Sequence, residues 1–222
     1  MTTKIINRSG SVLIITGILI AGSMFFYPDV TKPGFALRPA WIPVHFLLGV
    51  AALTGIYGLA GLHSTMIGKI STFGQWAFGV AILGNVLLAG LMFFVEVAMI
   101  PVLARYSAYQ ALLSRSGPLL HGTFGAMVLI SHLCTALGFW LLAGYLVTTK
   151  TVSTVNGLLF FGAPLLAFSP PLSFSMGIIG GVSLGAAIIW LGVSIRTGTA
   201  HEALAKELRI RDECFIEAEG HT

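Results

Sequence analysis

The amino-acid sequence predicts an all-α membrane protein, a polytopic bundle of transmembrane helices. Of its 222 residues, 56% are hydrophobic and only 9% are charged, whereas a soluble domain carries about 25% charged residues. The apolar residues stand in continuous runs, without the alternation that marks a membrane β-barrel. Backbone groups in lipid must bond within their own segment, so we expect these runs to be helices. Residues 1–195 are predicted to form the transmembrane domain.

Five runs are long enough to cross a hydrocarbon core, which takes ~20 helical residues. They are roughly Ser11 to Tyr27, Trp41 to Leu62, Phe73 to Leu103, Leu119 to Val147 and Leu172 to Ile195. The first follows Lys4 and Arg8, as the apolar part of a secretory signal peptide would. We interpret it as the first span.

The segment from Val155 to Phe168 is the main question of topology. It is short, contains Pro164, and is followed by Pro170 and Pro171. If it crosses, the chain has six spans with both termini on one side; if it is re-entrant, there are five spans and the termini are opposed. Six spans place eight Lys and Arg residues on the side of the termini and four on the other, which favours six spans with both termini cytoplasmic.

The last 27 residues, 196–222, form a charged tail with four basic and six acidic residues. The stretch from Thr199 to Glu202 fits the capping box that begins many helices. Apolar residues then recur among the charges, at Leu204, Leu208 and Phe215. We expect a short amphipathic helix outside the bilayer.

Several apolar phrases of the chain carry a family resemblance. They are GIYGLAGLH (55–63), LAGLMFFVEVAMIPVLA (88–104), GLLFFGAPLLAF (157–168) and GIIGGVSLGAAIIWLGVSI (177–195). In these phrases the chain resembles small multi-pass membrane proteins of bacteria, similar in style to the DUF4386-like proteins. The resemblance implies six short-looped helices in a bacterial cytoplasmic membrane, and it implies no activity.

Three ionisable residues lie inside the predicted spans at one depth, namely His45, Glu96 and His121. Such residues are costly in lipid and are therefore candidates for function. The two histidines could hold a haem b iron or a chlorophyll-type pigment, with Glu96 beside them. A glycine follows each histidine by one turn, at Gly49 and Gly125, and would leave room for a macrocycle. Alternatively, the histidines bond to backbone carbonyls and Glu96 pairs with a histidine or arginine that fixes the packing.

Glu96 is also a candidate for proton exchange or for binding a quinone headgroup, flanked by aromatic residues such as Tyr27. Deeper in the membrane, Asn85 and His132 are expected at similar depth. They form either a hydrogen bond between two helices or, with His121, a polar stripe for a proton or an ion.

The sequence lacks nucleotide-binding, hydrolase and metalloprotease motifs, which favours a protein that is not an enzyme. No run of basic residues could follow a nucleic acid.

Three hypotheses for the function remain, in this order. The first is an accessory or anchoring subunit of a larger complex, contacting lipids and other membrane subunits. The second is a redox subunit that binds haem, a pigment or a quinone. The third is a small proton-coupled transporter.

Overall fold

The computed structural model describes residues 2–30, 32, 34–66, 70–106, 109, 112, 117, 122–166 and 174–197. These residues form helices and no strands, which confirms the all-α prediction. Five of the helices are long and apolar enough to cross a membrane. The tail from residue 198 onward, and with it the expected amphipathic helix, lies outside the described residues.

The long helices are α1 (Thr2–Met24), α2 (Trp41–Met66), α3 (Thr72–Gly90), α6 (Thr123–Thr148) and α9 (Phe174–Arg196). Helix α3 continues through a π-helical stretch, η2 (Leu91–Met99), into α4 (Ile100–Arg105). Together these three elements make one apolar rod of 34 residues. A 3-10 turn, η1 (Phe35–Leu37), lies between α1 and α2.

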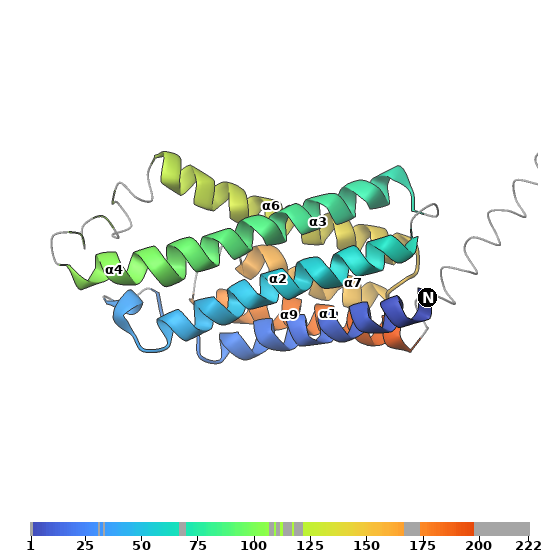
Figure 1. The fold of residues 1–222 in the computed structure, drawn as a ribbon, viewed down its shortest axis with the longest axis horizontal. Coiled ribbons are helices and arrows are strands. Elements are labelled where there is room, and N and C mark those ends of the chain that lie inside the picture. The colour runs from blue at the N-terminus through green and yellow to red at the C-terminus, as the bar shows by residue number, and fades with distance from the viewer. Residues whose placement is uncertain are drawn as a thin grey trace, which may run out of the picture.

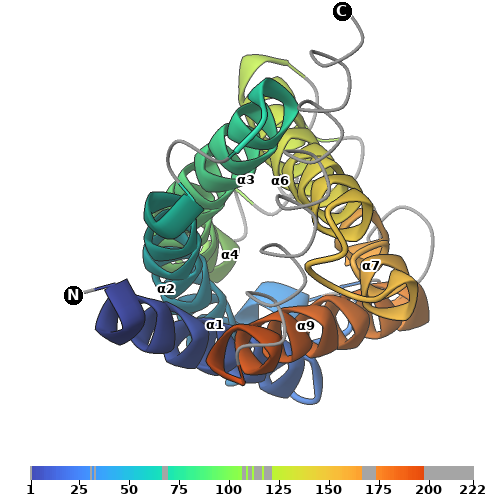
Figure 2. The ribbon, with the colours of Figure 1, turned by 90° about the vertical axis from the view of Figure 1, so that its right-hand side faces the viewer.

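The helices lie alongside one another; α1, α2, α3 and α6 alternate in direction along the chain, and α9 runs in the same direction as α6 (Figure 1). Seen along the bundle, α2 and α3 form one side of a triangle, α6 and α7 the second, and α1 and α9 the third (Figure 2). Gly10 of α1 packs on Gly192 of α9, and Gly17 packs on Gly185, so α1 and α9 are antiparallel. The start of α1 and the end of α9 therefore lie at the same end of the bundle.

A short apolar helix, Thr154–Leu166, lies between α6 and α9. Its first part is α7 (Thr154–Leu159), whose N-terminus is capped by the Ser153 hydroxyl accepting from the Asn156 N–H at 3.2 Å. A turn at residues 160–161 interrupts it. Along α9, Ser183 donates to the Leu159 carbonyl at 2.8 Å and Gly180 packs on Leu166, so the short helix runs opposite to α9.

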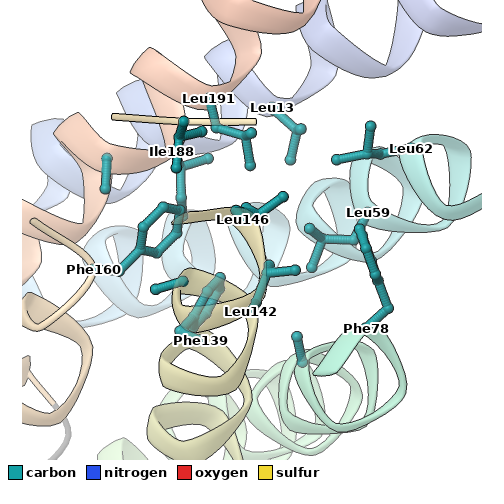
Figure 3. Close-up of a cluster of buried hydrophobic side chains, with 14 of the residues drawn as sticks. Leu13, Leu59, Leu62, Phe78, Phe139, Leu142, Leu146, Phe160, Ile188 and Leu191 are labelled. Atoms are coloured by element: carbon teal, nitrogen blue, oxygen red, sulfur yellow. The ribbon is translucent and has the colours of Figure 1, made fainter. Parts of the chain in front are cut away.

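The interior is filled by apolar side chains from all sides of the triangle. Figure 3 shows them pointing toward one another; the labelled ones are Leu13, Leu59, Leu62, Phe78, Phe139, Leu142, Leu146, Phe160, Ile188 and Leu191. Large apolar side chains also face outward, including Ile18 (55% exposed), Trp76 (69%) and Ile179 (61%). An outer surface this apolar is what lipid requires and what water disfavours.

Glycines allow two pairs of helices to touch through their backbones. A Cβ on Gly17 would overlap the Gly185 carbonyl oxygen, and one on Gly84 would lie 2.6 Å from the Thr135 Cα atom. Close approach through small residues is the usual way in which membrane helices gain packing contacts. We call these two backbone contacts the α1–α9 seam and the α3–α6 seam. They fix the positions of the four helices around the candidate functional site.

Candidate functional site

The π-helical stretch places Glu96 at one end of the bundle, and Pro101 explains part of its hydrogen bonding. In this stretch the N–H of Ile100 bonds five residues back, to the Val95 carbonyl. The next N–H in the same register would bond to the Glu96 carbonyl, but residue 101 is proline and has no N–H. The Glu96 carbonyl is therefore left without a partner from its own helix.

Trp41, the first residue of α2, supplies that partner. Its indole N–H donates to the Glu96 carbonyl at 2.8 Å. The Trp41 ring is 3% exposed and packs with Ala36 and Ala104 in a small apolar cluster that closes this end of the bundle. A buried carbonyl without a partner would be unfavourable, so Trp41 stabilises the π-helical stretch and fixes α2 against it.

His45 lies one turn after Trp41 and is 2% exposed. Its Nδ1 atom lies 2.8 Å from the Trp41 carbonyl, which can only accept, so Nδ1 carries a proton. The imidazole packs against the Trp41 ring with centroids 4.0 Å apart, and the Tyr27 ring lies 5.4 Å away. In this orientation the other ring nitrogen, Nε2, points toward η2, the π-helical stretch that follows α3.

His45 Nε2 faces Glu96 Oε2 at 4.0 Å. That oxygen is buried and has no hydrogen-bond partner among the described residues. Because Nδ1 already holds a proton, a neutral His45 presents a lone pair to the carboxyl group. Two facing lone pairs repel, so the pair is more stable when one of the two groups carries a proton. Burial favours the neutral arrangement, with this proton on Glu96, over a buried ion pair.

Tyr27 connects this pair to the interior of the bundle. It follows α1, its ring contacts His45, and it also lines a cavity between the helices. Burial raises the pKa of the Tyr27 hydroxyl above its usual range. Tyr27 therefore keeps its proton and acts as a neutral donor at physiological pH.

The cavity has a volume of about 80 Å³. Four of its lining residues are polar: Tyr27, Asn85, His132 and Thr135. The others are Ile20, Leu48, Ala52, Leu88, Met92, Phe139, Ala163, Leu166 and Leu184. Since a water molecule takes ~30 Å³ of liquid volume, the space suits two or three waters or a molecule of a few non-hydrogen atoms.

Asn85 and His132 both line the cavity, but they do not form the expected hydrogen bond with each other. Asn85 donates to the Ala81 carbonyl at 2.8 Å, and His132 Nδ1 lies 2.8 Å from the Val128 carbonyl. Each bond is to the residue's own helix. The bond between α3 and α6 comes instead from Thr135, whose hydroxyl lies 2.9 Å from the Gly84 carbonyl.

The surroundings of His45 do not fit a haem or a chlorophyll-type pigment. The Nε2 atom that would bind the metal faces Glu96, and Trp41 covers the imidazole. The space beside Gly49 is filled by the Phe93 ring, whose Cζ atom lies 2.8 Å from a Cβ built there. His121 lies outside the described residues. Within the described part of the chain, no three His, Cys, Asp or Glu side chains are grouped to hold a metal ion.

No family model, curated protein or solved structure matches this chain. The function must therefore be argued from the site itself. Sequence reasoning placed His45 and Glu96 at one depth, and the structure brings them together. Sequence reasoning missed Trp41 and Pro101, because Pro101 frees the Glu96 carbonyl only in the π-helical register, which the structure shows.

Proposed function

We propose that this protein is a six-span membrane carrier that moves a small solute together with a proton. The short helix Thr154–Leu166 supports the sixth crossing, because it runs opposite to both of its long neighbours, α6 and α9. Carriers commonly bind their substrates between helices that are interrupted within the membrane. Here the interrupted short helix lines the cavity through Ala163, and the π-helical stretch lines the same cavity through Met92.

The proposal rests on one observation, the buried pair of His45 and Glu96 with an unpartnered carboxylate oxygen. Loss of a proton from Glu96 leaves a buried negative charge that only a movement of the helices or entry of water can relieve. Gain and loss of the proton therefore favour different arrangements of the bundle. Such a two-state element is what couples proton movement to substrate movement.

The cavity lining indicates the chemistry of the solute. Among the described residues, its lining has no Lys, Arg, Asp or Glu side chain, and its polar groups are the Tyr27 hydroxyl, the Asn85 amide, the His132 imidazole and the Thr135 hydroxyl. These groups can bind one or two polar atoms of an otherwise apolar molecule. We propose a small uncharged solute.

The test uses liposomes that contain the purified full-length protein and a trapped pH-sensitive dye. A panel of small uncharged solutes is added to the outside, with liposomes free of protein as the reference. We expect at least one solute to move protons in the wild type. In Glu96→Gln, which keeps the shape but cannot exchange a proton, the signal should fall at least about tenfold.

His45→Gln should lose the signal as well, whereas the matched control His63→Gln should keep it. His63 lies near the other end of α2, beside Phe78. Proton movement of equal rate in Glu96→Gln would contradict the proposal, as would a wild type that no solute activates. The accessory-subunit hypothesis predicts instead that the gently solubilised protein has the mass of a complex with other subunits.

A further inference from the structure

A second polar region lies at the opposite end of the bundle, where α1 begins and α9 ends. It is a shallow surface groove of about 450 Å³. The residues that line it are Asn7, Arg8, Ser11, Val12, Tyr57 and Arg196. They come from α1, α2 and α9, so the groove exists only when these three helices are packed together.

Gly10 allows Arg196 to reach this groove. A Cβ built on Gly10 would lie 2.8 Å from Arg196 Cγ, so the stem of Arg196 lies directly across α1 at this glycine. A larger residue at position 10 would displace the arginine. The packing of α9 on α1 thus holds a second guanidinium group in the groove that Arg8 lines.

The groove is positively charged and the described structure offers no carboxylate near it. The acidic residues among the described positions are Asp29 and Glu96, and both lie at the other end of the bundle. Two exposed guanidinium groups in one groove produce a positive potential that attracts an anion. Guanidinium groups bind phosphate oxygens with paired hydrogen bonds, and the Asn7 amide adds a neutral donor.

The depth of the groove matches the boundary of a membrane. Arg196 is the last residue of its apolar span, and Arg8 is three residues into the first one. Tyr57 lies seven residues before the end of the span at Ser64, or ~10 Å deeper at 1.5 Å per residue. The charged part thus lies at headgroup level, and the part lined by Val12 and Tyr57 lies beside the acyl chains.

We infer that this groove binds one anionic phospholipid. Its phosphate lies between Arg8 and Arg196, and one acyl chain passes over Val12 and the exposed Tyr57 ring. Basic pockets between transmembrane helices on the cytoplasmic side are known to suit such headgroups. Because the lipid contacts both α1 and α9, it stabilises the seam that closes the bundle.

The test compares full-length wild type with Arg8→Gln/Arg196→Gln, and with Arg38→Gln/Arg105→Gln as a control. The control removes two exposed arginines from the other end of the bundle. Each protein is titrated in detergent with phosphatidylglycerol, phosphatidylcholine or inorganic phosphate. Thermal unfolding reports binding, and mass spectrometry of the intact protein counts bound lipids.

We expect phosphatidylglycerol to raise the unfolding temperature of the wild type and of the control more than phosphatidylcholine does. Each arginine is worth about fivefold in binding to an anionic surface, so the groove variant should bind about 25-fold more weakly and retain one lipid fewer. Equal responses of wild type and groove variant would overturn the proposal. So would a response to inorganic phosphate equal to that of the lipid, which indicates a free anion.

The acidic tail is the competing occupant of the groove. If its carboxylates covered the arginines, the wild type would not respond to phosphatidylglycerol. A variant in which the six tail acids are replaced by Asn or Gln would then gain the response. That pair of results would also overturn the proposal.

Discussion

The α1–α9 seam and the contact between α2 and the π-helical stretch both join helices of this bundle, but they do so in opposite ways. In the seam, glycines remove side chains, and the backbones of Gly17 and Gly185 touch. In the other contact, Trp41 and His45 approach Glu96 with polar groups. The Gly17–Gly185 contact contains no titratable group. The contact of His45 with Glu96 contains a carboxyl group that can lose its proton. We therefore expect the α1–α9 seam to stay fixed, while the contact between α2 and the π-helical stretch changes with protonation.

The largest effect should come from Gly17→Leu, because its side chain would overlap the Gly185 carbonyl. We expect a loss of about 3 kcal/mol in the free energy of unfolding. The matched control is Gly22→Leu in the same helix, where a Cβ would have no atom within 4 Å; its effect should stay within about 0.5 kcal/mol. Unfolding in mixed detergent measures both. Equal losses would mean that α1 and α9 are not in backbone contact.

Trp41→Phe should have the next largest effect. It keeps an aromatic ring but removes the N–H that donates to the Glu96 carbonyl. A buried carbonyl left without a partner costs about 1–2 kcal/mol. Trp76→Phe is the control, since Trp76 is 69% exposed and should change the unfolding free energy by less than about 0.5 kcal/mol. A Trp41→Phe protein as stable as the control would rule out this role for the indole.

Pro101→Ala should make the loss of the indole less severe. Alanine restores an N–H that can bond to the Glu96 carbonyl in the register that Ile100 already follows. We therefore expect Trp41→Phe to cost about 1 kcal/mol less in the Pro101→Ala background than in the wild type. A double-mutant cycle of unfolding free energies measures this coupling. Strictly additive effects would show that proline is not the reason why the carbonyl needs Trp41.

The smallest effect should come from Thr135→Val, which keeps the shape and removes the hydroxyl 2.9 Å from the Gly84 carbonyl. Hydrogen bonds between membrane helices average about 0.6 kcal/mol, and we expect a loss of this size in the same unfolding assay. A loss above about 2 kcal/mol would mean that hydrogen bonding, rather than glycine packing, holds α3 to α6.

The sequence predicted the helical bundle because hydropathy and length suffice to define apolar helices. The sixth crossing and the tail helix stay predictions. For the site, the common depth of His45 and Glu96 could be predicted, since depth follows from position along a span. It could not give their lateral contact, which depends on how α2 is rotated against its neighbour by Trp41 and by the Phe93 ring beside Gly49. The π-helical register does not change the hydropathy of the sequence, so the sequence does not predict it.

The most direct test of the central claim is an infrared difference spectrum of the full-length protein in lipid. We expect Glu96 to carry a proton beside His45. At neutral pH the wild type should show a carboxylic C=O stretching band that is absent from Glu96→Gln, moves in His45→Gln and is unchanged in His63→Gln. A spectrum without any band that depends on Glu96 would mean that the carboxylate is ionised, and would contradict the account.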